Sequence, residues 1–186
     1  MKRVIAALLG VFLLTGCSKS DTVLDSAVSL RNRLLESNGC SFNAEITADY
    51  GEKLYAFSME CQADAAGNLT FTVTEPESIS GITGKLSEEG GKLTFENQAL
   101  AFEMLADGQI TPVSTPWVFL KTLRSGYLNA QGKDGDYIKL SVDDSYKEDA
   151  LHLDIWLNQA QEPVRAEILW QGIRVVSIAI SAFKFL

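Results

Sequence analysis

The chain has 186 residues, of which 46% are hydrophobic and 22% charged, and its 24 acidic and 16 basic residues give a formal net charge of −8 at pH 7. Such a length fits one domain with a sizeable core, since domains usually hold roughly 100 to 200 residues. The acidic balance disfavours nucleic-acid binding, because the phosphate backbone calls for clustered lysine and arginine.

The first sixteen residues have the pattern of a bacterial lipoprotein signal peptide. Lys2 and Arg3 precede the uncharged stretch 4–14, which is shorter than the roughly 20 apolar residues of a spanning helix. Residues 14–17, Leu-Thr-Gly-Cys, match the lipobox, in which small residues precede a cysteine that carries a diacylglyceryl group. We therefore expect removal of residues 1–16, a lipid anchor on Cys17 and a location on the outer face of the plasma membrane.

Signal cleavage would also change the charge and the reach of the chain. Without Lys2 and Arg3, fourteen basic residues face twenty-four acidic ones, a net charge of −10. An anionic bilayer repels such a domain, so attachment should depend on the lipid alone. The lipidated cysteine and its short tether, residues 17–21, reach roughly 15 Å at about 3.5 Å per residue. The remaining residues, 22–186, would form one domain close to the membrane.

The next elements are a helix and a β-hairpin. Apolar residues at three- and four-residue steps predict a helix over 22–36. A two-residue period then predicts strands over 41–50 and 53–62. If Asp49 pairs with Glu52 across the turn, Cys40 and Cys61 lie opposite each other.

That cysteine pair has two interpretations. A cross-strand disulfide fits an oxidising compartment and would stabilise the fold by roughly 3 kcal/mol. The alternative is two buried, reduced thiols. The sequence holds one histidine and no closely spaced cysteine pair, so we expect neither a metal site nor a cofactor.

The rest of the chain predicts one more helix among many strands. The helix covers 114–124, where Pro116 fits the first turn and Gly126 lies just past the end. The further strands are predicted at 69–73, 78–86, 92–95, 98–102, 137–142, 150–157, 164–170 and 173–183. A large antiparallel sheet with helices against one side accounts for this order, so the fold class is α+β and mainly β.

This layout resembles the LolA/LolB-like lipoprotein-carrier superfamily. The segments 71–76, 105–108, 122–127 and 154–157 are similar to those of uncharacterised lipoproteins from clostridia-type Gram-positive bacteria, and the layout is similar to the spore-germination lipoprotein GerS. The resemblance implies an incomplete barrel with helices on its concave face. It also implies a groove for acyl chains, or a scaffold that binds another protein. The carriers hold a loop or helix closed with an arginine, but neither Arg165 nor Arg174 aligns with it.

The apolar residues of the second helix and of the late strands are the candidate ligand groove. They are Trp117, Phe119, Leu120 and Leu123 on the helix, and Trp156, Trp170, Val176 and Ile178 on the sheet. The same residues are equally suited to an ordinary core between helix and sheet, because a cavity and a packed core use the same residue types.

Three groups of polar residues are candidates for a catalytic or metal site. His152 and Asp154 share a strand face, but no motif places a nucleophile beside them, so we interpret His152 as a sheet-surface residue. The acidic run 143–149 lacks the EF-hand order and is more typical of a solvated turn. Glu75 and Glu77 are adjacent acids at a strand end, which is a common arrangement. We therefore expect a protein that is not an enzyme.

Two hypotheses follow for its function. The first is a membrane-anchored domain that binds a lipid or another apolar ligand in a groove between sheet and helices. The alternative is a scaffold that holds or activates an extracytoplasmic protein, such as a cell-wall or germination enzyme.

Overall fold

The computed structural model of the chain describes residues 21–88, 90–94 and 106–186. The predicted signal peptide, the predicted lipidation site Cys17 and the strand predicted at 98–102 lie outside these residues. The predicted helices are both present, as α2 (Asp21–Glu36) and α3 (Thr115–Ser125), within one residue of the expected ends. In the described part of the chain, no helix combines the length and the apolar character needed to cross a membrane.

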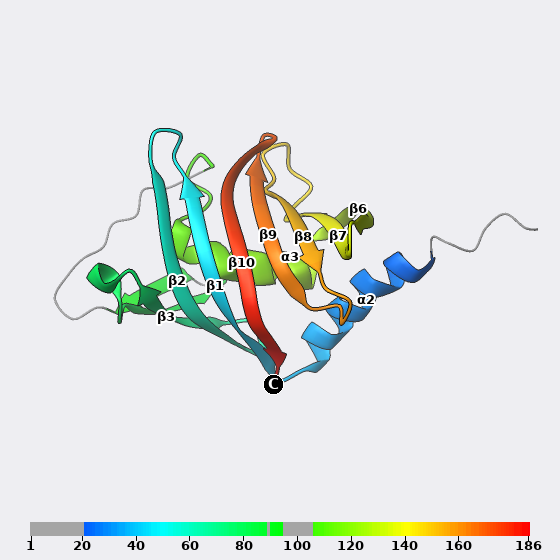
Figure 1. Cartoon of the computed structure of the whole chain (residues 1–186), viewed down its shortest axis with the longest axis horizontal. Coiled ribbons are helices and arrows are strands. Elements are labelled where there is room, and N and C mark those ends of the chain that lie inside the picture. Colours follow the sequence, from blue (N-terminus) through cyan, green and yellow to red (C-terminus); the bar gives the residue numbers. More distant parts are fainter. Residues whose placement is uncertain (1–20, 89, 95–105) are drawn as a thin grey trace, which may run out of the picture.

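The described strands form one antiparallel sheet of ten strands (Figure 1). They are β1 (Gly39–Asp49), β2 (Leu54–Asp64), β3 (Leu69–Glu75), β4 (Thr83–Ser87), β5 (Gly90–Thr94), β6 (Tyr127–Asp134), β7 (Tyr137–Asp143), β8 (His152–Leu157), β9 (Pro163–Trp170) and β10 (Ile173–Phe185). Their order is β5-β4-β3-β2-β1-β10-β9-β8-β7-β6. Two five-stranded meanders therefore meet where β1 pairs with β10.

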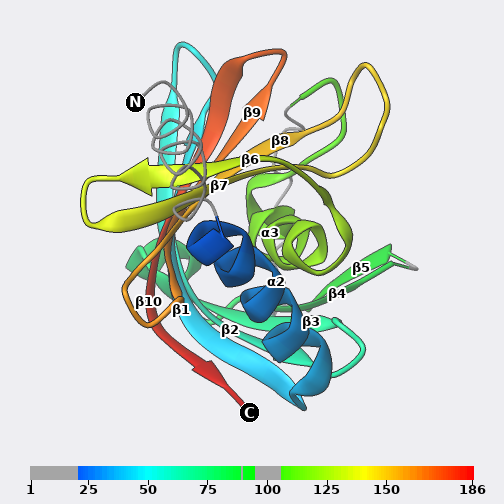
Figure 2. The same cartoon turned by 90° about the vertical axis from the view of Figure 1, so that its right-hand side faces the viewer.

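Both helices lie inside the curve of this sheet, with strands of the two meanders around them (Figure 2). A short 3-10 helix, η3 (Pro112–Ser114), leads into α3, and its start is closed by reciprocal hydrogen bonds between Thr111 and Ser114. Gly126 ends α3 as predicted. An added Cβ there would lie 2.6 Å from the carbonyl oxygen of Thr122 and 2.7 Å from that of Asp143, so only glycine fits.

The core fills the space between the sheet and the helices. Alternate residues of β1, from Cys40 to Ala48, point inward and are buried. Phe119 of α3 is fully buried and meets the Phe42 ring edge-to-face, with 6.1 Å between ring centroids. Phe183 stacks on Phe42, with 5.9 Å between ring centroids. The predicted fold class, an incomplete antiparallel barrel with helices on its concave face, is confirmed.

The predicted register of the β1–β2 hairpin was wrong by two residues. Asp49 pairs with Leu54 rather than Glu52, because the turn holds four residues and is closed by a 2.9 Å hydrogen bond from the Tyr50 amide to the Lys53 carbonyl.

This register moves the two cysteines apart. Cys40 lies opposite Ala63, and Cys61 lies opposite Phe42. The two thiols still face the core but are diagonal neighbours, whose Cα atoms are about 7–8 Å apart in an antiparallel pair, beyond usual disulfide geometry. The expected disulfide is absent, and both cysteines are free and buried.

Two strands also differ from the prediction. Residues 127–134 form β6, which the sequence did not predict, because most of its side chains are exposed and its pattern lacks apolar alternation. The strand predicted at 78–86 starts only at Thr83. A 3-10 helix, η2 (Glu77–Ile79), precedes it, and Gly81 turns the backbone with a φ of +86°.

Candidate functional site

The predicted groove residues occupy a filled interior. Phe119, Leu120 and Leu123 of α3 pack with Val176 and Ile178 of β10, and none of the five is more than 3% exposed. Trp117 and Trp170 are partly buried and pack against the same core. The hollow detected beside Leu120 has a volume of only about 10 Å³, which is about the least that holds one water molecule.

Trp156 does not belong to that interior, which corrects its assignment to the groove. It alternates along β8 with the inward-facing Ile155 and Leu157, so its side chain lies on the outer face of the sheet. Its indole nitrogen donates to Asp134 at 2.7 Å. Its cross-strand partners Lys139 and Arg165 carry cations 5.0 and 4.4 Å from the ring centroid.

Two arginines of the helices, rather than the arginines of the late strands, bind the helices to each other. The Arg31 guanidinium on α2 donates to the carbonyl of Leu123 at 2.8 Å and to that of Gly126 at 2.7 Å. Arg124 on α3 donates in return to the carbonyls of Leu34 on α2 and Ala65, both at 2.9 Å. Each arginine thus binds a carbonyl in the last turn of the other helix, where carbonyls have no partner within the helix, and Arg124 also binds the β2–β3 turn at Ala65.

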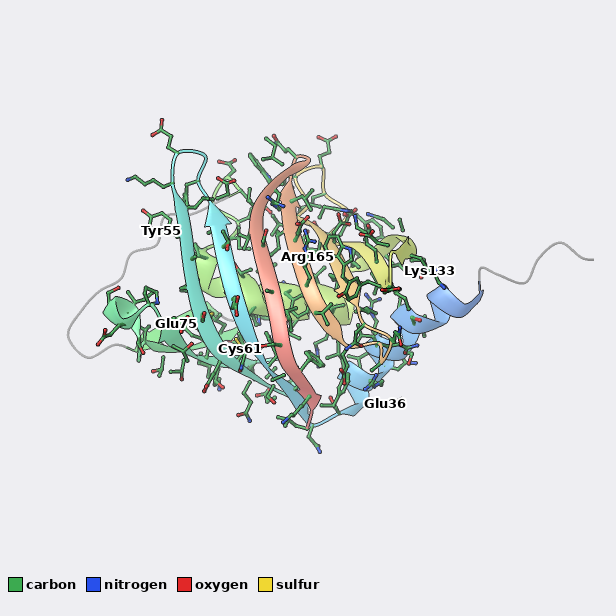
Figure 3. All side chains as sticks on the ribbon, viewed as in Figure 1. Glu36, Tyr55, Cys61, Glu75, Lys133 and Arg165 are labelled. Carbon is green, nitrogen blue, oxygen red and sulfur yellow. The ribbon has the colours of Figure 1, made fainter. Side chains whose placement is uncertain are left out.

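The late-strand arginines lie elsewhere. Arg165 and Arg174 both bind Glu167 on the outer face. Arg165 is labelled in Figure 3 on the side of the sheet turned to the viewer, with α3 behind. Neither arginine therefore takes the closing role that the carriers give to theirs.

The predicted surface histidine belongs to a polar network on the outer face of β7 and β8. The two ring nitrogens of His152 lie 2.7 Å from an Asp143 oxygen and 3.3 Å from an Asp154 oxygen. Ser141 donates to Asp154 at 2.6 Å, and the Lys139 ammonium lies 2.8 Å from the same carboxylate. Burial raises the pKa of Asp154, but the hydrogen bonds from Lys139 and Ser141 outweigh it and hold that pKa below its usual value.

The polar groups of this network are held by hydrogen bonds. The Ser141 hydroxyl donates to a carboxylate rather than to the histidine. Asp144 of the acidic loop accepts a hydrogen bond from the Leu151 amide at 2.9 Å. Among the residues the structure describes, no group of histidine, cysteine and carboxylate side chains is arranged to hold a metal ion.

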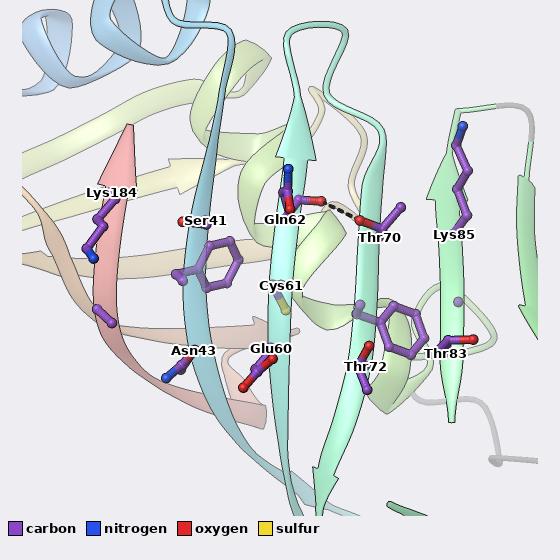
Figure 4. Close-up of a pocket in the computed structure, with 14 residues that line it drawn as sticks. Ser41, Asn43, Glu60, Cys61, Gln62, Thr70, Thr72, Thr83, Lys85 and Lys184 are labelled. Atoms are coloured by element: carbon purple, nitrogen blue, oxygen red, sulfur yellow. Dashed lines mark hydrogen bonds between the residues drawn. The ribbon is translucent and has the colours of Figure 1, made fainter. Parts of the chain in front are cut away.

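Two much larger hollows lie on the outer face. One, of about 720 Å³, spans β10, β1, β2, β3 and β4 (Figure 4). The strand register arranges its outward side chains in two rows across the sheet. The first, here called the lysine row, is Lys184-Ser41-Gln62-Thr70-Lys85. The second is Ser181-Asn43-Glu60-Thr72-Thr83.

A second hollow, of about 780 Å³, continues along β1, β2 and β3. Its charged lining residues, here called the glutamate patch, are Glu45, Glu75 and Glu77. Glu75 and Glu77 are the adjacent acids noted in the sequence. Ser58 donates to Glu75 at 3.4 Å. The outward side chains of the two hollows are therefore mostly polar, with lysines at the ends of the first row, Glu60 in the second row and the glutamate patch beyond it.

Sequence reasoning missed this face. The alternation of polar residues in β1, β2 and β3 shows that one face is solvated, but the rows depend on strand pairing. Lys85 and Lys184 lie 99 positions apart in the sequence and share a row only through four strand pairings.

The fold and these surfaces define the class: a half-barrel of antiparallel strands with its interior closed by two helices. No family model matches the sequence, and no curated protein matches it. Solved structures with a similar fold include an uncharacterised conserved protein of Thermus thermophilus (13% identity, TM-score 0.47, 87% of this chain and 88% of that one).

Two further likenesses are more distant. A LolA superfamily protein of Nitrosomonas europaea has 10% identity and a TM-score of 0.42, over 91% of this chain and 94% of that one. The MucA/MucB complex of Pseudomonas aeruginosa has 9% identity and a TM-score of 0.42, over 87% of this chain and 57% of that one. At these identities the likeness concerns the fold alone.

Proposed function

We propose that this chain is a lipid-anchored extracytoplasmic protein that acts by binding, and that its ligand is a protein held across the outer face of the sheet. The observation that carries this proposal is the contrast between the two faces. The hollow beside Leu120 measures about 10 Å³, and the two on the outer face measure about 720 and 780 Å³. This contrast supports placing a protein ligand ahead of a lipid, which reverses the order of the two hypotheses drawn from the sequence.

The outer hollows suit a macromolecule better than a small molecule. Small-molecule sites are enclosed and mostly apolar, with a few polar groups that fix orientation. The rows on the outer face are open and consist of hydroxyl, amide and charged side chains. Such a surface can supply the roughly one hydrogen bond per 100–200 Å² that is typical of protein interfaces.

The sequence supports the anchor and the absence of catalysis. The lipobox around Cys17 and the short tether favour a domain that works beside the membrane. The one histidine of the described chain bridges two aspartates, and the Ser141 hydroxyl on the neighbouring strand is bound to one of them. Among the described residues, these contacts place no serine or cysteine beside the histidine for it to activate.

Photo-crosslinking in cells tests the proposal. A photoreactive amino acid replaces Thr72 at the centre of the outer hollow, and a control replaces Asp136 in the exposed β6–β7 turn. We expect one protein partner to crosslink at Thr72 and not at Asp136. Absence of a protein crosslink at both positions would refute protein binding, and bound lipid in the same protein would favour the lipid candidate.

A lipid ligand remains the second candidate because the interior is apolar. Among described residues, the buried polar side chains are Ser26, Thr115, Thr122 and Asp154, and Asp154 lies on the outer face. An acyl chain would need α3 to move outward, which breaks the bonds made by Arg31 and Arg124. Native mass spectrometry of the protein extracted in mild detergent tests this candidate. Bound acyl chains beyond the mass of the covalent anchor would support it.

A further inference from the structure

We propose that the outer face is a bipolar docking surface. Its occupant is a segment of another polypeptide that presents carboxylates to the lysine row and lysine or arginine to the glutamate patch. This inference rests on the proposed function of protein binding and specifies the chemistry of the partner.

The strand register fixes the spacing of the two charged groups. Neighbouring strands lie about 4.8 Å apart, so the backbones of Lys184 and Lys85, four strands apart, are separated by about 19 Å. Ser41 in the lysine row and Glu45 in the glutamate patch are four residues apart on β1, or about 14 Å. That distance exceeds the Debye length of about 8 Å at physiological ionic strength. Glu60, in the row between them, lies two strands away from either lysine. Positive and negative charges therefore occupy different positions along the outer face.

These charges are available for binding. Lys85, Lys184 and Glu45 are exposed, and none of them is in an ion pair with another described residue. Other cations of the outer face behave differently, because Lys139 on β7, Arg165 on β9 and Arg174 on β10 are each paired with a carboxylate. Lys85 on β4 and Lys184 at the end of β10 have no such ion pair with another described residue.

Between the charged ends, the rows offer hydrogen-bonding groups of both kinds. Asn43 and Gln62 carry amides that donate and accept, and Thr72 carries a hydroxyl. The Thr70 hydroxyl donates to the Gln62 carbonyl at 3.2 Å, a bond drawn in Figure 4. A polypeptide backbone has alternating donors and acceptors, so this lining is chemically matched to it.

The balance of charge favours a polypeptide over a polyanion. Four carboxylates line the two hollows (Glu45, Glu60, Glu75 and Glu77) against two ammonium groups. A phosphate polymer drawn to the lysines would be repelled along the rest of the face. A segment that carries both signs meets attraction at each end, and like charges in the wrong register exclude other partners.

The inference is tested by reversing charges in the protein that carries the photoreactive residue at position 72. One variant combines Lys85→Glu with Lys184→Glu, and a second combines Glu45→Lys with Glu75→Lys, both with the photoreactive residue at Thr72. Matched controls reverse exposed charges away from the outer hollows: Lys53→Glu with Lys147→Glu, and Glu52→Lys with Glu148→Lys. Thermal unfolding midpoints show that each variant is folded.

We expect each pair of charge reversals on the outer face to lower the yield of the crosslinked complex about tenfold, since two surface ion pairs with the partner become two repulsions. The controls should stay within about twofold. Raising the salt concentration should weaken the original complex, because the contacts are exposed.

Other outcomes overturn the inference in distinguishable ways. A crosslink at Thr72 that neither pair of reversals changes would overturn the bipolar surface while leaving protein binding in place. Tighter binding after the Glu45 and Glu75 reversals would identify a polyanion instead. A crosslink to a second copy of this chain would replace the heterologous partner with self-association. Absence of any protein crosslink would refute the proposed function itself.

Discussion

Replacing Arg31 with alanine should destabilise the protein by about 2–3 kcal/mol. Its guanidinium makes two bonds, of 2.8 and 2.7 Å, to carbonyls at the end of α3. Hydrogen bonds from charged donors contribute about 1.5–3 kcal/mol each, and we take the lower value because the side chain is only partly buried. The matched control is Arg33→Ala on the same helix, which loses one 3.3 Å bond to the Ala160 carbonyl and a stack 4.1 Å above Phe185.

Urea unfolding of a protein comprising residues 21–186 measures both variants. With a slope of about 2 kcal/mol per molar urea, the Arg31 variant should lose roughly 1 M in its midpoint. The control should lose less than half of that. The double variant with Arg124→Ala should cost less than the sum of the two single variants, because each arginine fixes the helix that the other one binds. Equal costs for Arg31→Ala and Arg33→Ala would refute the reciprocal clamp.

Three other predictions follow from the core and the polar network. Phe119→Ala should cost about 3–5 kcal/mol in urea unfolding, because it empties the centre of the interior. Asp154→Asn should lower the free energy of unfolding by about 1–2 kcal/mol. Because the pKa of Asp154 is lowered in the folded state, the difference in stability between the original protein and this variant should be complete above about pH 4 and should disappear as the pH falls further. Burial raises the pKa of Cys40 to about 11 and that of Cys61 still higher, so iodoacetamide should label the folded protein at pH 7 at least about a hundredfold more slowly than the unfolded one. An unlabelled protein two mass units lighter after unfolding would show a disulfide instead.

The sequence was sufficient to predict elements in which one face is buried and the other is exposed to solvent. β1 alternates buried and exposed residues almost without interruption, and α3 shows a broad apolar arc, so both were predicted within a residue or two. β6 has little burial on either face, and no period could reveal it. Periodicity also does not fix strand register, which depends on the length of the turn. The four-residue turn after Asp49 therefore separated the cysteines that a shorter turn would have paired.

For the candidate sites, too, burial could be predicted from the sequence, whereas placement that depends on strand pairing could not. Seven of the eight predicted groove residues pack in one interior, because apolar character is enough to predict burial. Trp156 is the exception. The alternation along β8 places it on the face of His152 and Asp154, but its apolar character favoured the interior, and the cover that Lys139 and Arg165 give its indole depends on strand pairing. The lysine row required knowledge of four strand pairings at once.

The pairing of β1 with β10 has a consequence for how the molecule is made. Phe185 pairs with Cys40, and the Leu186 amide donates to the Gly39 carbonyl at 2.9 Å, so the middle of the sheet joins residues about as distant as the domain allows. Until the last strand emerges, a growing or translocating chain holds two meanders without the seam between them. Contacts of such long range slow folding. For a chain that we propose is threaded through a membrane, the sheet therefore cannot be completed until β10 has crossed.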